Sequence, residues 1–279
     1  MNSGSKPAAQ DPFDALYNVV QKATGLDLSE YKQDQLRRRL TTWAEARGDH
    51  DLAALGRRLA NDPKEMRELF DRISINVSEL YRNPQRWDEL AKKVLPGLAK
   101  KTPRLKCWSA GCSFGAEAHT LAAVLETEGY RYSIVGTDID EDALATARAG
   151  RFDAAAMRGV PLDVKRKHFS EVGGEWQAGD ALRRNLRFKN GNLLADRFED
   201  GFDLILCRNV VIYFNDTAKD KLYRRFFHAL KPGGVLFVGG TERIFDAKGM
   251  GYEAPLPFFY QKPSLPTPGG AQHQWRNAS

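Results

Sequence analysis

The sequence is poor in cysteine and has no long apolar run. Its three cysteines, Cys107, Cys112 and Cys207, are an odd number without C-x-x-C spacing, which argues against a disulfide framework or a zinc cluster. Its five histidines are scattered, so we predict no metal site. No stretch reaches the roughly 18 apolar residues of a membrane span, and the first ten residues lack the apolar segment of a secretion signal. We therefore expect a cytoplasmic protein without membrane insertion.

The composition is that of an ordinary globular protein. Of 279 residues, 42% are hydrophobic and 28% charged, and 42 Lys and Arg against 36 Asp and Glu give a net charge of +6. This charge is mild and basic residues are not interleaved with aromatic ones, so we expect no nucleic-acid partner. Residues 1–11 predict a flexible leader and residues 263–279 a disordered tail, because both are rich in small and polar residues. No pattern indicates an oligomer, so we take the chain as a monomer.

The spacing of apolar residues predicts two domains. In residues 12–100 apolar residues recur three and four apart, which predicts a small all-helical domain. Residues 101–262 alternate short apolar strands with helices, which predicts an α/β domain with a parallel, doubly wound sheet. Within it, the polar stretch at about 168–190 is expected to be a small β-subdomain insertion, with a hairpin at Gly173 and Gly174.

A glycine turn and an aspartate follow the first two predicted strands of this domain. Ligands of open α/β sheets bind at the carboxyl ends of the strands, where the turn that begins at Gly111 lies. Asp138 ends the second strand and suits two ribose hydroxyls; the alternative is a cap for the next helix, although Asp140 is better placed for that. Ser113 stands where the dinucleotide pattern G-x-G-x-x-G has its second glycine, which favours S-adenosylmethionine over NAD.

Two later segments end strands with polar residues. Asn192 could pair with an adenine edge or simply form a turn after Gly191. Arg208, Asn209 and Tyr213 follow a strongly apolar strand and could form an active edge; the alternative is a helix cap at Asn209 beside a packed Tyr213.

Three segments together are more specific than any one motif. The stretches NVSELYRNPQRW (76–87), WSAGCSFGAEAHTLA (108–122) and CRNVVIYF (207–214) resemble the chemotaxis receptor glutamate O-methyltransferases, the CheR family, and the likeness extends in order over residues 13–262. The resemblance implies an all-helical domain followed by a Rossmann-like methyltransferase domain with a β-subdomain. It also implies transfer of a methyl group from S-adenosylmethionine to glutamate side chains on chemoreceptor cytoplasmic helices, in chemotaxis adaptation. The products are glutamate methyl esters and S-adenosylhomocysteine.

The resemblance also assigns roles by matching position. The residues implied to bind the cofactor, with Gly111 in the glycine turn, are Asn76, Ser78, Arg82, Glu117, Asp138, Asn192, Leu193, Arg208 and Asn209. Arg82 and Tyr213 would flank the reacting methyl group, and the β-subdomain would touch the receptor. The family usually has Ser/Thr-Gly-Glu-Glu-Pro-Tyr where this chain has Phe114-Gly-Ala-Glu-Ala-His119; the glutamate that is kept is Glu117.

The chemistry of this reaction asks little of the protein beyond placement. A glutamate side chain, with a pKa of about 4.3, is already an anionic nucleophile at neutral pH, so no general base is expected. We predict that Arg82 holds a carboxylate and that Tyr213 donates a hydrogen bond to the glutamate oxygen that does not attack. Arg37, Arg38 and Arg39 are predicted to bind acidic receptor helices, although a solvated helix face is the plainer interpretation of any single arginine.

Two other functions fit the same motifs. The chain could be a methyltransferase of this scaffold that acts on another protein or a small acid. It could also be a regulatory module that binds S-adenosylmethionine without turnover, an alternative suggested by Phe114 and Ala116.

Overall fold

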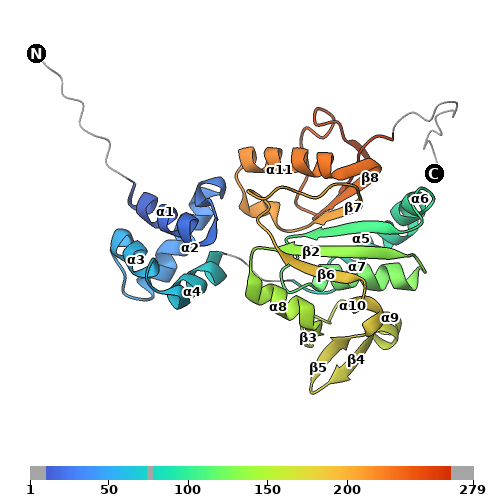
Figure 1. Ribbon diagram of the computed structural model, residues 1–279, viewed down its shortest axis with the longest axis horizontal. Coiled ribbons are helices and arrows are strands. Elements are labelled where there is room, and N and C mark those ends of the chain that lie inside the picture. The colour runs from blue at the N-terminus through green and yellow to red at the C-terminus, as the bar shows by residue number, and fades with distance from the viewer. Residues whose placement is uncertain (1–10, 74–77, 265–279) are drawn as a thin grey trace, which may run out of the picture.

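The fold is that of a computed structural model, which describes residues 11–73 and 78–264. A lobe of helices precedes a larger lobe built on a sheet, and the two lie side by side (Figure 1). No helix in these two ranges is both long and apolar enough to cross a membrane.

Within residues 11–73, the first lobe has four α-helices around one core. They are α1 (Pro12–Thr24), α2 (Gln33–Glu45), α3 (Leu52–Leu59) and α4 (Pro63–Ile73), with a short 3-10 helix, η1 (Leu28–Glu30), between the first two. Their buried faces carry the residues of the apolar pattern, among them Leu16, Leu36 and Leu55. Asp51 caps α3 and Asp62 caps α4, because each side chain accepts hydrogen bonds from the first backbone N–H groups of the helix.

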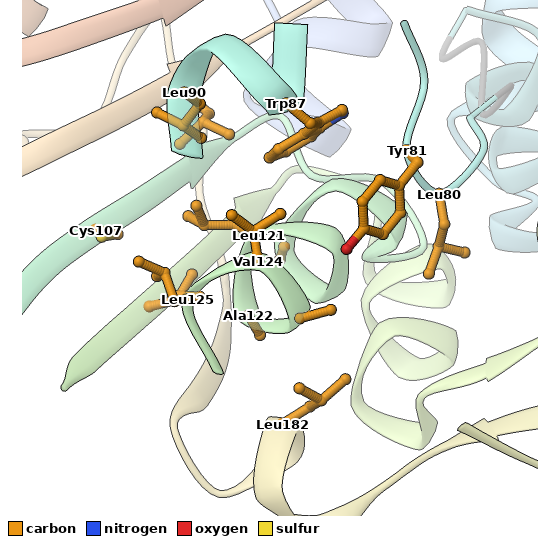
Figure 2. Packing of buried hydrophobic residues seen from close by; sticks show 14 of the residues in the cluster. Leu80, Tyr81, Trp87, Leu90, Cys107, Leu121, Ala122, Val124, Leu125 and Leu182 are labelled. Atoms are coloured by element: carbon orange, nitrogen blue, oxygen red, sulfur yellow. The ribbon is translucent and has the colours of Figure 1, made fainter. Parts of the chain in front are cut away.

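The next helical segment belongs to the sheet lobe. It runs from α5 (Pro84–Glu89) through a π-helical turn, η2 (Leu90–Val94), to α6 (Leu95–Ala99). Trp87 and Leu90 pack with Cys107 and Leu121 in the core that covers one face of the sheet (Figure 2). The residues predicted as one helical domain, 12–100, therefore belong to two lobes. The helices of Pro84–Ala99 turn their apolar side to the sheet and not to the four helices of the first lobe.

The main sheet has seven strands in the order β6-β2-β1-β7-β8-β10-β9. Five are parallel: β6 (Leu186–Asn190), β2 (Tyr132–Asp138), β1 (Leu105–Ala110), β7 (Phe202–Cys207) and β8 (Leu230–Val238). The last two, β9 (Glu253–Leu256) and β10 (Phe259–Gln261), are antiparallel, so the sheet is mixed where we predicted a parallel one.

Helices cover both faces of this sheet (Figure 1). They are α7 (Ala116–Thr127), α8 (Glu141–Ala149) and α11 (Asp216–Ala229), and a short 3-10 helix, η3 (Val211–Tyr213), precedes α11. Alternate residues of β1 point to opposite faces, so Cys107 joins the core under α7 while Trp108 joins the core under α11. The strand is thus buried on both sides, and its carboxyl end is left to carry a site.

The β-subdomain is a three-stranded antiparallel sheet, ordered β3-β5-β4, beside α8. Its strands are β3 (Arg151–Phe152), β4 (Phe169–Val172) and β5 (Glu175–Ala178), joined to α9 (Leu162–His168) and α10 (Asp180–Arg183). The hairpin turns at Gly173 and Gly174, as expected, with φ of 62° and 83°. The predicted bounds of the subdomain, about 168–190, differ from the observed ones at both ends. The subdomain begins earlier, at β3, because a strand of two residues has no alternation that the sequence could show. It ends earlier, because β6 pairs with β2 in the main sheet.

Candidate active site

A cavity lies at the carboxyl ends of four adjacent parallel strands. Gly111, Asp138, Gly191 and Arg208 stand at the ends of β1, β2, β6 and β7 and line it together. The other lining residues include most of the predicted set: Ser78, Arg82, Glu117, Asn192, Leu193, Asn209 and Tyr213. Asn76 lies outside the described residues. Segments more than a hundred residues apart in sequence thus meet at one edge of the sheet.

The loop after β1 is held by the end of β2. The backbone N–H groups of Gly111 and Cys112 donate to the Thr137 carbonyl, at 2.8 and 3.0 Å. Ser113 has a positive φ of 48°, and its N–H donates to an Asp138 carboxylate oxygen at 2.7 Å. Asp140, and not Asp138, caps α8 by accepting from the N–H groups of Asp142 and Ala143. Burial raises the pKa of Asp138, whose side chain both fixes this loop and lines the cavity.

Glu117 and Arg208 form a buried, charged wall. A Glu117 oxygen accepts a hydrogen bond from the Ser109 hydroxyl at 2.6 Å, and the other lies 3.8 Å from an Arg208 nitrogen. Burial raises the pKa of Glu117 to about 7, against the opposing effect of Arg208. The Arg208 guanidinium lies over the rings of Trp87 and Phe237, and its Nε has no hydrogen-bond partner within the described chain.

The turn that carries Arg82 has an unusual backbone. Tyr81 and Asn83, on either side of Arg82, have positive φ angles of 56° and 59°. The Arg82 carbonyl accepts hydrogen bonds from Arg208 Nη2 at 2.8 Å and from Trp87 Nε1 at 3.1 Å. Left-handed backbone at non-glycine residues is costly and concentrates at functional sites, and Arg82, between these two residues, lines the cavity.

The loop after β7 is held by a residue that we did not predict. Glu242, only 3% exposed, accepts hydrogen bonds from the N–H groups of Asn209, Val210 and Gly239, at 2.5 to 2.8 Å. Asn209 has a positive φ of 61°. Glu242 therefore fixes the path that leads from Arg208 to Tyr213. Nothing in the sequence around Glu242 distinguishes it from a surface glutamate.

The three predicted arginines of α2 point to different surroundings. Arg37 pairs with Asp11 and lies over the Phe13 ring, and Arg38 is exposed. Arg39 turns toward the site: its guanidinium lies 5.6 Å from the centre of the Tyr213 ring and donates to the Ile73 carbonyl at 3.0 Å. They do not form one face, because consecutive residues are about 100° apart around a helix.

Asn192 forms a turn and also joins the two lobes. Its side-chain oxygen accepts from the Leu194 N–H at 2.9 Å, and its side-chain nitrogen donates to the Gly25 carbonyl at 3.0 Å. The turn interpretation of Asn192 is therefore confirmed for the side chain. Arg225 of α11 fixes the same loop by donating to the carbonyls of Leu193 and Asp196.

The helical lobe also lines the cavity, through Leu26, Tyr31 and Ile73. We did not predict these residues for the site. Apolar and aromatic residues in a helical region indicate a core, and no local pattern separates these three from their neighbours. Only the position of one lobe against the other identifies them.

The departures from the family motif lie away from the cavity. Phe114 packs against the core under α7, near Phe152, and is not among the lining residues of the described chain. His119 is fully buried between Phe152 and Phe188, and its Nδ1 donates to the Gly115 carbonyl at 2.9 Å. Burial lowers the pKa of His119 to about 4, so it is neutral.

The residues present suit S-adenosylmethionine. Two carboxylates, Glu117 and Asp138, match its cationic groups and its ribose hydroxyls, while Arg82 matches its carboxylate. The buried Arg208 Nε without a partner leaves a donor free on the same wall. Among residues 11–73 and 78–264 we find no cluster of metal-binding side chains.

Comparison with known proteins gives consistent matches along the chain. The family model described as "CheR methyltransferase, all-alpha domain" matches residues 11–74, and "CheR methyltransferase, SAM binding domain" matches residues 76–257. A chemotaxis protein methyltransferase of Listeria monocytogenes is 37% identical over 254 residues, which cover 89% of this chain and 97% of the relative. Chemotaxis protein methyltransferase 1 of Pseudomonas aeruginosa is 33% identical over 251 residues, 85% of this chain and 92% of the relative.

A putative S-adenosyl-L-methionine-dependent methyltransferase of Methanococcus maripaludis has 19% identity and a TM-score of 0.32, over 56% of this chain and 62% of that one. A likeness at this level carries no conclusion about function.

Proposed function

The chain belongs to the CheR methyltransferase family and uses S-adenosylmethionine, and we propose that its substrates are glutamate side chains on the cytoplasmic helices of chemoreceptors. One observation carries this proposal. Arg82, Glu117, Asp138, Arg208 and Tyr213 come from four separate segments and line one cavity at the carboxyl edge of the sheet. Because the receptor helices are cytoplasmic, the chain would act in the cytoplasm.

The cofactor would be held by its charged and polar ends. Asp138 accepts hydrogen bonds from ribose hydroxyls, Glu117 attracts the cationic amino group, and Arg82 pairs with the carboxylate. When bound, S-adenosylmethionine supplies a methyl group already activated by the positive sulfonium. The protein then has to orient the acceptor and keep water out, and orientation of this kind can be worth up to about 7–11 kcal/mol.

Tyr213 would orient the acceptor carboxylate. Burial raises the pKa of the Tyr213 hydroxyl, so it stays protonated at neutral pH and can donate a hydrogen bond to the glutamate oxygen that does not attack. Arg39 lies over the Tyr213 ring and Arg82 lines the same cavity, so both add positive charge where an anionic side chain would enter. This charge favours the carboxylate over the neutral ester product.

The exposed part of α2 would meet the receptor. Arg38 is exposed and Arg39 lies over the ring of the cavity residue Tyr213, so an acidic helix bound along α2 would bring a glutamate near Tyr213. Attraction between exposed charges is screened by salt, so receptor affinity should fall between low and high ionic strength.

A transfer assay tests the proposal. The chain is incubated with tritiated S-adenosylmethionine and a receptor cytoplasmic fragment, and methanol released by base is counted, since only carboxyl methyl esters release it. We expect label on the receptor, and a loss of about 10- to 100-fold in turnover for Tyr213→Phe, the size expected for one hydrogen bond to a charged group. Tyr130→Phe, outside the cavity, is the matched control and should keep full activity.

The assay also separates the alternatives. Label on a different protein or on a small acid would support another substrate for the same scaffold. Cofactor binding without any label would support a regulatory module. The position of Phe114 outside the cavity lining of the described chain removes one reason for that last alternative.

A further inference from the structure

The segment between α1 and α2 is fastened to the segment that carries Tyr213. The Lys32 N–H donates to the Tyr213 carbonyl at 2.9 Å, and the Asn215 N–H donates to the Glu30 carbonyl at 2.9 Å. These bonds enclose an isolated antiparallel bridge between Tyr31 and Phe214. The two rings pack edge to face, with their centres 5.2 Å apart. Tyr31 therefore has a fixed backbone and a fixed ring.

The same segment lines the cavity described above. Tyr31 and Leu26 line the cavity together with Asp138, Ile139 and Leu193. The Asn192 side chain donates to the Gly25 carbonyl at 3.0 Å, so the loop after β6 is tied to the residue just before Leu26. Burial and the nearby charge of Asp138 both raise the pKa of Tyr31, which agrees with a phenol close to that carboxylate.

We propose that Tyr31 is a cofactor-binding residue, which closes the cavity over the adenosyl group from the helical lobe. The proposal rests on the proposed function, because it needs an adenosyl ligand at Asp138. A tyrosine ring offers an apolar face to an adenine or a ribose, and its hydroxyl offers a hydrogen-bond donor to the same ligand. The helical lobe is then part of the cofactor site as well as a surface for the substrate.

A ligand that touches both lobes must also stabilise their contact. Any ligand that binds the docked arrangement more tightly than the undocked one shifts the population toward docking. Cofactor binding should therefore protect the hydrogen bonds at Lys32 and Asn215, which join the lobes. An empty enzyme would hold its receptor-binding helix less firmly than a loaded one.

Calorimetry with S-adenosylhomocysteine tests the role of Tyr31 in the full-length chain. We expect Tyr31→Ala to raise the Kd about tenfold or more, as for the loss of one desolvated aromatic contact, and Tyr31→Phe to keep most of the affinity. Tyr17→Ala is the matched control: Tyr17 packs on the same lobe but is outside the cavity lining of the described residues. Its Kd should match the wild type.

Three results would overturn the proposal. A Tyr31→Ala protein with wild-type affinity would remove Tyr31 from the site and leave the proposed function intact. Equal weakening by Tyr31→Ala and Tyr17→Ala would show that the effect passes through folding of the lobe. Absence of binding by the wild type would remove this proposal and the proposed function together.

Hydrogen exchange gives a second measurement that needs no variant. In the wild type, S-adenosylhomocysteine should slow exchange of the peptides that contain the Lys32 and Asn215 amides. The peptide that contains the Asn61 amide, which bonds within the lobe to Arg58, should not change. Unchanged exchange at Lys32 and Asn215 in a saturated sample would contradict the coupling.

Discussion

Two loops at the carboxyl edge of the sheet are each held by a buried carboxylate that accepts backbone hydrogen bonds, but the two carboxylates differ in what they do. The loop after β1 contains Ser113 with φ of 48°, and the loop after β7 contains Asn209 with φ of 61°. A carboxylate accepts the N–H of each residue: Asp138 for Ser113 and Glu242 for Asn209. Burial raises the pKa of both carboxyl groups, yet the backbone donors still favour the charged form.

The two carboxylates differ in what else they reach. Asp138 lines the cavity, whereas Glu242 is not among the lining residues in the described ranges and accepts three N–H groups from two loops. We infer that Asp138 serves the ligand and the loop, while Glu242 serves the backbone alone. Substitution of Asp138 should therefore change mainly the cofactor affinity, and substitution of Glu242 mainly the free energy of unfolding.

The largest effect is expected at Glu242. Glu242→Ala leaves three backbone donors without their acceptor, at about 1–3 kcal/mol each, so the variant should lose several kcal/mol of unfolding free energy and most methyl transfer. Urea unfolding and the transfer assay measure both. Glu253→Ala, an exposed glutamate on β9, is the control. A Glu242→Ala protein with an unfolding free energy within 1 kcal/mol of wild type would show that the hydrogen bonds of Glu242 do not stabilise the fold.

Asp138→Asn should weaken ligand binding more than it lowers the free energy of unfolding. The amide keeps one oxygen to accept the Ser113 N–H, so we expect a smaller loss of stability than for Glu242→Ala. It cannot accept two ribose hydroxyls as a carboxylate does, so the Kd for S-adenosylhomocysteine should rise about 10- to 100-fold. Calorimetry measures the change, and an unaltered Kd would exclude Asp138 from ligand binding.

Glu117 should make cofactor affinity depend on pH. Its pKa is raised to about 7, so its charge, which attracts the amino group of the cofactor, is gained as pH rises through neutrality. The Kd for S-adenosylhomocysteine should fall up to about tenfold between about pH 6 and 8. Glu117→Gln should flatten this dependence, and a profile that is equally steep in both proteins would assign it to another group.

His119 should affect stability without affecting the ligand. Its pKa is lowered from 6.5 to about 4, so the unfolded chain binds more protons between these values and stability falls as pH drops through that window. The loss is roughly 1–2 kcal/mol between about pH 6.5 and 5. His119→Phe should be less acid-sensitive in urea unfolding, with unchanged S-adenosylhomocysteine affinity at neutral pH. An identical pH profile would contradict the assignment.

The parts of the site that depend on local sequence patterns could be predicted from the sequence. Asp138 follows an alternating strand and Gly111 follows the strand before it, so the topology of a parallel sheet is enough to bring them together. Asp140 was recognised as a cap because a helix follows it directly. Arg208 and Tyr213 stood out as polar residues after an apolar strand.

The rest depends on contacts between distant segments. Glu242 acts on Asn209, 33 residues away, and the function of Tyr31 depends on the docking of one lobe on the other. The Pro84–Ala99 helices carry the same periodicity whether they pack on helices or on a sheet. Helical spacing tells which face is buried but not against what, so the predicted boundary near residue 100 was misplaced.

A crystal structure of the full-length chain with S-adenosylhomocysteine is the most direct test of the central claim, that this cavity is the methyl-donor site. We expect the ribose hydroxyls on Asp138, the amino group near Glu117 and the adenosyl group beneath Tyr31. The ligand bound at any other place, or a saturated crystal with this cavity empty, would contradict the account.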